Sequence, residues 1–317
     1  MILTVTPNPS LDRTYEVPAL ERGEVLRASG ERVDPGGKGV NVSRAVAAAG
    51  HRTVAVVPLG GAPGALVAQL LAGQDIEVAP VPVAGHTRSN IAIAEPDGTL
   101  TKVNAPGPEL TPEESEAILA SVGAYSPAAD WIACCGSLPR GLAPEWYAEL
   151  VTRAHGAGAR IALDTSGPSL LAALAARPDV VKPNAEELAE AVGRPLATVG
   201  DAVKAAGELR DLGAGTVLAS LGADGQLLVS EAGTWFGTAR VDTVRSNVGA
   251  GDASLAGFLA AGGEGPQALA AAVAHGAAAV QLPGSEMPTP GDLNPSAVTV
   301  TDDVPLDREL SEQGSPR

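Results

Sequence analysis

The sequence predicts an α/β protein: a three-layer α/β sandwich with a mainly parallel central sheet. Three observations support this prediction. From residue 53 onward, short β-branched or apolar runs alternate with longer alanine-rich segments of helical spacing. Most of the short runs are apolar throughout, as strands covered by helices on both faces must be. The connections are short, which favours right-handed crossovers between parallel strands.

The expected strands of the central sheet, in chain order, are 2–6, 53–57, 130–134, 160–163, 179–181 and 216–219. The expected helices are 39–49, 63–71, 112–122, 144–155, 185–192, 200–211, 253–261 and 266–280. Several of these helices begin with proline, whose missing N–H costs nothing in the first turn.

Two stretches, 11–34 and 83–104, interrupt the alternation of strands and helices. Polar and apolar residues alternate in both, and the second contains a Pro-Asp-Gly turn at 96–98. These features predict antiparallel strands. Because the stretches flank a glycine-rich segment at 36–39, we expect a small β-sheet lid over one end of the main sheet. An apolar outer face on such a sheet would pair with a second copy, so a homodimer through the lid is expected.

Composition limits the classes of partner and the domain count. The chain has 317 residues, 45% of them hydrophobic, and a net charge of −16. That charge argues against nucleic acid or an anionic membrane as the main partner. Residues 1–294 are expected to form one domain, and the polar, acidic residues 295–317 a disordered tail. Two adjacent cysteines and the lack of a targeting segment predict a cytoplasmic protein.

The strongest local motif is Gly249-Ala250-Gly251-Asp252, which precedes an apolar helical stretch. Its two glycines allow a sharp turn that exposes successive N–H groups, and the following helix adds its positive end. Together they form an anion pocket that a phosphate would fit. Asp252 is either an N-terminal cap of the helix or a base that faces this pocket.

Two common nucleotide-binding motifs are absent from the sequence. The third glycine of a dinucleotide fingerprint would fall on Ser254, which disfavours hydride transfer. The lysine of Gly36-Gly37-Lys38-Gly39 has the wrong spacing for a P-loop and no hydroxyl residue follows it.

Five segments resemble, in order and spacing, the ribokinase-like (pfkB) carbohydrate kinases over almost the whole chain. The likeness is strongest to the phosphosugar kinases. It implies ATP- and Mg²⁺-dependent phosphorylation of the 6-hydroxyl of D-fructose 1-phosphate to fructose 1,6-bisphosphate. Kinases of tagatose 6-phosphate or fructose 6-phosphate are the near alternatives; a non-catalytic sugar-phosphate sensor and a nicotinamide-linked oxidoreductase belong to other classes. The five segments are Asn-Pro-Ser-Leu-Asp at 8–12, Pro-Gly-Gly-Lys-Gly-Val-Asn-Val-Ser-Arg-Ala at 35–45, Lys-Pro-Asn-Ala-Glu-Glu at 182–187, Ser-Leu-Gly-Ala-Asp-Gly at 220–225, and the Gly-Ala-Gly-Asp motif.

The resemblance also implies roles for individual residues. Asp252 is similar to the family's catalytic base, and the N–H groups of Gly249, Ala250 and Gly251 to its anion hole. The implied substrate residues are Asp12, Gly36, Gly37, Asn41 and Ser137 for the sugar, and Lys38, Arg88 and Arg27 for the phosphate already on it. Turn chemistry, a helix start and a solvated edge charge are the alternative explanations of these residues.

On the nucleotide side, the resemblance implies the set Lys182, Asn184, Ser220, Gly222, Gly225, Asn247, Ala277 and Ala278, with Asn184 and Glu187 helping to hold Mg²⁺. A helix capping box at 184–187, a hairpin turn at 223–225 and a close-packed helix are the alternatives. Asn247, Ala253 and Arg140 depart from the family pattern, which leaves monovalent-cation binding and the fine shape of the pocket open.

Overall fold

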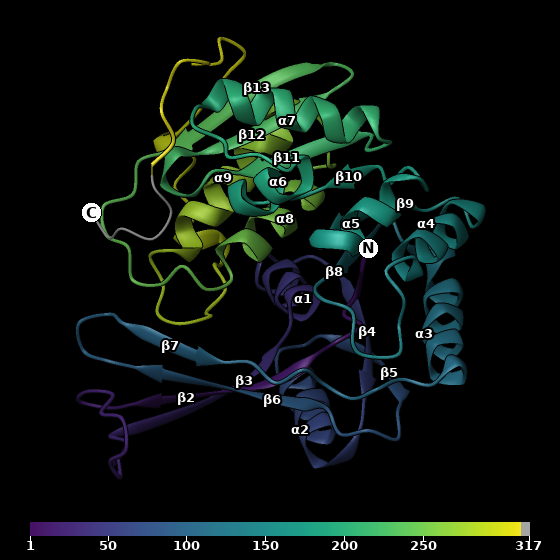
Figure 1. Cartoon of the computed structure of the whole chain (residues 1–317), viewed down its shortest axis with the longest axis vertical. Coiled ribbons are helices and arrows are strands. Elements are labelled where there is room, and N and C mark those ends of the chain that lie inside the picture. Colours follow the sequence, from purple (N-terminus) through teal and green to yellow (C-terminus); the bar gives the residue numbers. More distant parts are fainter. Residues whose placement is uncertain (312–317) are drawn as a thin grey trace.

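The large sheet has ten strands, and Figure 1 shows it in the upper and central part of the molecule. The computed structural model describes residues 1–311. The strands are β1 (Ile2–Val5), β4 (Thr53–Leu59), β5 (Glu77–Pro82), β8 (Trp131–Cys135), β9 (Arg160–Asp164), β10 (Val180–Val181), β11 (Thr216–Ser220), β12 (Gln226–Ser230), β13 (Gly233–Ala239) and β14 (Val298–Thr301). Their order is β14-β13-β12-β11-β10-β9-β8-β1-β4-β5.

Neighbours from β5 to β11 pair in parallel, which confirms the mainly parallel sheet. All six expected strands are present. Strand β5 was not predicted, because Pro80 and Pro82 interrupt its pattern; prolines are tolerated there because the strand lies at the edge. The antiparallel strands β12, β13 and β14 form the other edge.

Helices cover both faces of this sheet, which confirms the three-layer sandwich. Alternate strand residues enter different clusters, since Leu3 packs with one layer and Ile2 with the other. None of the helices within 1–311 is long and apolar enough to span a membrane. One layer contains α1 (Lys38–Ala48), α2 (Gly61–Ala72), α8 (Ala250–Ala260) and α9 (Gly265–Ala279). The other contains α3 (Pro112–Tyr125), α4 (Trp146–Gly156), α5 (Gly167–Leu174), α6 (Ala185–Val192) and α7 (Val199–Asp211).

A separate sheet of four strands projects from the lower part of the molecule in Figure 1. Its strands are β2 (Ser10–Glu16), β3 (Gly30–Gly36), β6 (Arg88–Ala94) and β7 (Leu100–Val103), in the order β3-β2-β6-β7. The pairs β2–β3 and β6–β7 are antiparallel, as predicted. The central pair β2–β6 is parallel, which the sequence analysis did not anticipate. No hairpin turn joins β2 to β6, because β3, α1, β4, α2 and β5 lie between them in the chain.

The segment 295–311 is ordered, so the prediction of a disordered tail is wrong for these residues. Strand β14 pairs with β13, and Val298 and Val300 pack against the apolar cluster of α8 and α9. The following residues run beside the start of α7, where Val199 N–H donates to the Arg308 carbonyl at 2.9 Å. The polar composition of the segment conceals this apolar pair. Residues 312–317 of the predicted tail lie outside the described residues.

Candidate active site

Helix α8 begins at the glycine-rich motif. Gly249 is its N-cap residue, with a left-handed φ of 80°. The backbone conformation therefore favours glycine here, and the flexible end of Met287 is the nearest atom to a Cβ at this position, at 2.9 Å. The first N–H groups of a helix have no partner within it, and they carry the positive end of its dipole. Lys182 Nζ lies 3.2 Å from where a Cβ of Gly251 would be. A cation and free amides therefore meet at one place.

Asp252 lies in the first turn of α8 and is 7% exposed. The cap residue of the helix is Gly249, so the alternative interpretation of Asp252 as an N-terminal cap is wrong. Asn41 Nδ2 donates a hydrogen bond to Asp252 Oδ2 at 2.9 Å. Burial, and then the charge of Asp164, raise the pKa of Asp252 to about 7, while Lys182, Asn41 and Lys38 oppose the rise. A buried carboxyl group with this pKa is suited to accept a proton near neutral pH.

An ion triad lies beside Asp252, and its buried centre, Asp164, was not among the predicted site residues. This residue ends β9 and is fully buried. Lys38 Nζ lies 2.7 Å from Asp164 Oδ1, and Lys182 Nζ lies 2.9 Å from Asp164 Oδ2. Burial alone would raise the pKa of Asp164, but the two lysines outweigh it and lower that pKa, so the carboxylate stays ionised. The available signal was an aspartate directly after a buried strand, at the carboxyl edge where α/β proteins bind ligands.

Asp164 also holds Lys38 in its charged form. Burial would lower the pKa of Lys38, but the charges of Asp164 and Glu187 outweigh burial and raise it. Lys38 Nζ lies 3.2 Å from Glu187 Oε1. The triad therefore places two lysine ammonium groups next to Asp252, in an otherwise acidic protein. This arrangement suits the binding of an anionic ligand.

Asp12, Gly36 and Gly37 meet where β2 and β3 join the main body. Asp12 Oδ1 accepts hydrogen bonds from Ser10 Oγ at 2.6 Å and from Asn90 Nδ2 at 2.9 Å. A Cβ on Gly36 would lie 2.2 Å from Asp12 Oδ2, so only glycine leaves the carboxylate in place. Gly37 caps α1 with a φ of 114°. Asn90 was not among the predicted site residues, although it lies only two residues after Arg88.

The three remaining predicted substrate residues differ in where they lie. Arg88 donates to the carbonyls of Ala105 and Asn8 at 3.0 and 2.9 Å, and its buried Nε has no partner within residues 1–311. Ser137 lies close by, with its Oγ 3.5 Å from Asn8 Nδ2. Arg27 is exposed in the loop between β2 and β3, at the far end of the small sheet from Asp12. The structure therefore does not bring Arg27 to the other site residues.

Asn184 and Glu187 form a capping box at the start of α6, which confirms the alternative interpretation of this pair. Asn184 N–H donates to Glu187 Oε2 at 2.9 Å, and Glu187 N–H donates to Asn184 Oδ1 at 2.8 Å. The other Glu187 oxygen faces Lys38. No group of three metal-binding side chains occurs among residues 1–311. Capping does not exclude contact with Mg²⁺ through water, because each of these oxygens keeps a second lone pair, and that role stays a prediction.

The predicted nucleotide-side residues lie around the hairpin between β11 and β12. Ser220 N–H donates to the Pro183 carbonyl at 3.1 Å, which places the end of β11 beside Asn184. Gly222 and Gly225 have left-handed φ angles of 62° and 127°. The antiparallel pairing of β11 and β12 confirms the hairpin turn offered as the alternative interpretation of 223–225.

The helix α9 lies against this hairpin. A Cβ on its Gly276 would lie 3.2 Å from Nε2 of Gln226, the residue after Gly225. The next two residues of α9 are the predicted Ala277 and Ala278, of which Ala278 is buried. Asn247 lies in the segment that leads into α8 and is exposed. The small residues on α9 and the two hairpin glycines are therefore close in space.

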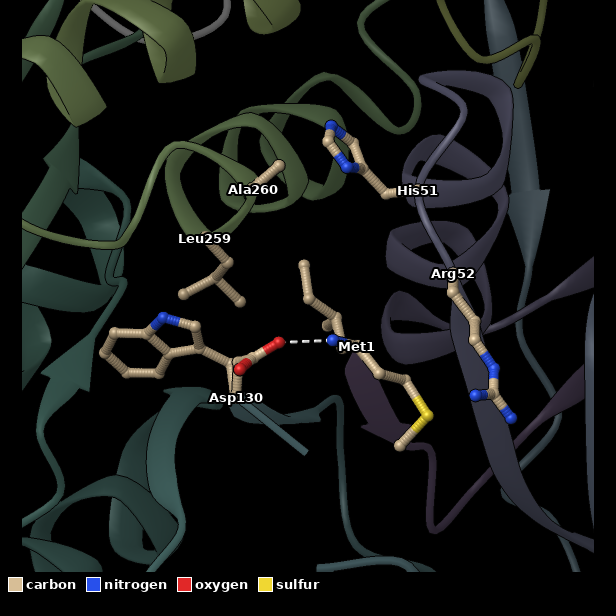
Figure 2. Close-up of a pocket in the computed structure, with 8 residues that line it drawn as sticks. Met1, His51, Arg52, Asp130, Leu259 and Ala260 are labelled. Carbon is tan, nitrogen blue, oxygen red and sulfur yellow. Dashed lines mark hydrogen bonds and ion pairs between the residues drawn. The ribbon is translucent and has the colours of Figure 1, made fainter. Parts of the chain in front are cut away.

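Two hollows lie away from all these residues. Figure 2 shows the smaller one, of about 110 Å³, at the amino-terminal ends of β1 and β8, where Met1 pairs with Asp130. Asp252 lies at the opposite, carboxyl-terminal ends of the strands. The larger hollow, of about 410 Å³, is lined by α3, α4 and the loop before α4. Neither hollow is lined by a predicted site residue. The candidate site is therefore assigned from the residues at the carboxyl ends of the strands.

Comparison with known proteins agrees with this geometry. Residues 6–291 match the family model described as pfkB family carbohydrate kinase. The chain belongs to the pfkB family of carbohydrate kinases. The 1-phosphofructokinase of Rhodobacter capsulatus is 39% identical to this pfkB kinase over 305 residues, which cover 95% of the chain and 96% of that relative.

Solved structures of phosphofructokinase-2 from Escherichia coli are similar to this pfkB kinase. The complex with substrates and products has a TM-score of 0.86 at 33% identity, covering 92% of the chain and 96% of the other. The tetrameric inhibited form has a TM-score of 0.84 at 33% identity, covering 90% and 95%. The predictions of a ribokinase-like fold and of a carbohydrate kinase that uses ATP as co-substrate are confirmed.

Proposed function

We propose that this pfkB kinase transfers the γ-phosphoryl group of ATP to the 6-hydroxyl of D-fructose 1-phosphate and so forms fructose 1,6-bisphosphate. The buried Asp252, beside the free amides of α8 and the cation of Lys182, supports phosphoryl transfer. The similarity to a 1-phosphofructokinase over 95% of the chain supports this choice of sugar phosphate.

In the proposed reaction, Asp252 takes the proton from the 6-hydroxyl as that oxygen attacks the γ-phosphorus. A bond forms between the sugar oxygen and phosphorus, and the bond from phosphorus to the bridging oxygen of ADP breaks. The proton stays on Asp252 until it passes to solvent. Negative charge on the transferred group is stabilised by the N–H groups of Gly249, Ala250 and Gly251 and by Lys182. Mg²⁺, when bound on the ATP phosphates, would neutralise further charge there.

The sugar would be held on the opposite side of Asp252. Asp12 Oδ1 already accepts two hydrogen bonds, which leaves Oδ2, beside Gly36, for a sugar hydroxyl. The partner-free Nε of Arg88 and the ammonium group of Lys38 are the cationic donors for the phosphate already on the sugar. Arg27 has no role in this arrangement within one chain.

A comparison of three sugar phosphates tests the proposed substrate. ADP release is measured with fructose 1-phosphate, fructose 6-phosphate and tagatose 6-phosphate at equal concentrations. We expect the highest kcat/KM with fructose 1-phosphate. A higher value with either of the others would replace the proposed substrate. Binding of fructose 1-phosphate without ADP release would instead support a sugar-phosphate sensor.

Replacement of the proposed base tests the mechanism. Asp252→Asn keeps the size of the side chain but cannot accept the proton, so kcat should fall on the order of 10²–10⁴-fold. The matched control is Asp211→Asn, at the exposed end of α7. In the parent enzyme, kcat/KM should fall about tenfold for each pH unit below 7, because the protonated carboxyl group is inactive. Unchanged turnover in Asp252→Asn would exclude the assigned role.

We also infer a homodimer that buries the outer face of the small sheet. Ile91 and Val103 are 41% and 60% exposed and lie opposite each other on β6 and β7. Ile93, two residues further along β6 and therefore on the same face, is half-buried. Contiguous exposed apolar residues favour a protein contact over solvent. A second copy of the chain presents the same face, so the contact can close on itself.

A further inference from the structure

Arg44 is a buried arginine on α1, and the proposed reaction assigns it no role. It is 7% exposed, and its guanidinium group meets side chains from four parts of the fold. Burying an arginine is costly unless its donors are satisfied. Its partners are Gln74 Oε1 at 3.0 Å from Nε, Asn41 Oδ1 at 3.3 Å and Ser285 Oγ at 3.4 Å from one terminal nitrogen, and Asp34 Oδ1 at 4.0 Å from the other.

The contact with Asn41 connects Arg44 to the base. Asn41 has two ends: Oδ1 faces Arg44, and Nδ2 donates to Asp252 at 2.9 Å. A guanidinium group carries hydrogen-bond donors only, so it can bind the oxygen of an amide but not its NH₂ group. Arg44 thereby determines which end of the Asn41 amide faces Asp252.

The orientation of this amide matters for proton transfer. An N–H that points at Asp252 stabilises the ionised carboxylate, which is the form that accepts a proton. With the opposite orientation, the amide oxygen would accept a hydrogen bond from the protonated carboxyl group and stabilise the inactive form. We propose that Arg44 is a positioning residue for phosphoryl transfer, which acts through Asn41 to keep Asp252 in its proton-accepting form.

Arg44 also connects this arrangement to the small sheet. Asp34 lies on β3, and its other oxygen accepts from Arg32 Nε at 2.7 Å. A displacement of β3 would therefore move Arg44 and, through Asn41, change the hydrogen bond to Asp252. The charged groups that face Asp252 are Asp164 from β9, Lys182 after β10, and Lys38 and Arg44 from α1. The charged groups that face Arg44 are Asp34 and Arg32 from β3, Asp12 from β2, and Asp252.

A double-mutant cycle separates positioning from a simple effect of charge. The variants are Arg44→Met, Asn41→Ala and the combination, and the measurement is the acid limb of the pH profile of kcat/KM. Arg44→Met should move the midpoint of that limb upward on the order of 0.5–1 pH unit and lower kcat on the order of tenfold to hundredfold. When Asn41 is already alanine, Arg44→Met should move the midpoint by less than half as much.

The matched control is Arg52→Met. Arg52 lies at the start of β4, on the opposite edge of the sheet, with its side chain 73% exposed. This change should move neither the midpoint nor kcat. If Arg44→Met does not fold, Arg44→Lys takes its place: it keeps the charge but lacks the planar fork that spans Gln74 and Asn41, so a smaller upward movement that depends on Asn41 is expected.

The inference rests on the proposed role of Asp252, so a second measurement avoids turnover altogether. The unfolding free energy of Asp252→Asn is compared with that of the parent across pH, with arginine and with methionine at position 44. The pH at which this difference levels off reports the ionisation of Asp252 in the folded protein and should rise in Arg44→Met. Equal movements with and without Asn41, or a folded Arg44 variant with an unmoved midpoint, would overturn the inference. Full turnover in Asp252→Asn would overturn only the role of the base.

Discussion

At the scale of single residues, Asp252 shows how a buried carboxyl group, here the proposed base, opposes stability. Its ordinary pKa is 3.8, and in the folded protein burial and the charge of Asp164 raise the pKa to about 7. Folding therefore favours the protonated form. The cost of burying the charge is absent below pH 3.8, grows as the pH rises to about 7, and is constant above that value.

Removal of this carboxyl group should stabilise the fold. A pKa displaced by one unit corresponds to about 1.4 kcal/mol, so Asp252→Asn should raise the unfolding free energy at pH 8 on the order of 2–4 kcal/mol. The gain should shrink as the pH falls toward 4. Denaturant unfolding at several pH values measures it. A variant that is less stable than the parent at pH 8 would contradict the linkage.

A glycine is the decisive residue at the sugar side of the site. Gly36→Ala would place a methyl group 2.2 Å from Asp12 Oδ2, and Ser10 and Asn90 hold that carboxylate in place. The carboxylate must shift, so KM for the sugar phosphate should rise on the order of tenfold to hundredfold, with KM for ATP nearly unchanged.

The control for this prediction is Gly123→Ala in α3, where an added methyl group would meet no atom within 4 Å. It should leave both KM values as they are, and alanine is the better helix former. Steady-state kinetics of the two variants provides the comparison. Equal sugar KM values for both would show that Gly36 has no role in binding the sugar phosphate.

At the scale of elements, the segment after β14 holds the hairpin of the proposed nucleotide side. Asp224 lies in the short helical turn Gly222–Asp224 and is 6% exposed. It accepts hydrogen bonds from the N–H and the hydroxyl of Ser311 at 2.6 and 3.1 Å. Arg308 lies 3.4 Å from the same carboxylate. One buried side chain therefore fastens the last described residues to the hairpin.

Asp224→Ala should release this segment. The loss of a buried acceptor and its donors should lower the unfolding free energy by about 1–3 kcal/mol. Limited proteolysis should then cleave within 302–311 faster than in the parent. Asp303→Ala is the control, because Asp303 is an exposed residue of the same segment. Cleavage at the rate of the control would show that Asp224 does not hold the segment.

At the scale of the whole molecule, the site lies where the two sheets meet. Strand β1 of the large sheet leads into β2 of the small one, and β3 leads into α1, which holds Lys38, Asn41 and Arg44. The small sheet supplies Asp12 and Arg88, and the large sheet with its helices supplies the ion triad and α8. A movement of one sheet against the other would therefore bring the sugar side and the base together.

The proposed dimer tests how the small sheet is completed. Ile91→Asp with Val103→Asp places charges on the apolar face of β6 and β7. Sedimentation velocity should give twice the mass of one chain for the parent and the mass of one chain for this variant. Leu212→Asp is the control, since Leu212 is 57% exposed at the end of α7. A parent that sediments as a single chain at micromolar concentration would exclude the dimer.

Much of the architecture and part of the site could be predicted from the sequence. The alternation of strands and helices, the two interrupting hairpins and the helix that follows the glycine-rich motif all depend on neighbouring residues, whose spacing the sequence displays directly. The predicted start of that helix at residue 253 is three residues late, because α8 begins at Ala250. The same holds for the capping box of Asn184 and Glu187. The segment 295–311 was misjudged, because its order depends on partners in β13 and α7 that are distant in the chain.

The sequence by itself determined which groups are available: a carboxylate after two glycines, a lysine in a glycine-rich turn, and the helices that carry them. Only the tertiary structure decided their partners. Asp164 meets Lys38 across 126 positions, and Asn41 meets Asp252 across 211. The physical reason is that charge interactions in a buried site depend on distance in space and on exclusion of water, and neither quantity is a property of sequence spacing.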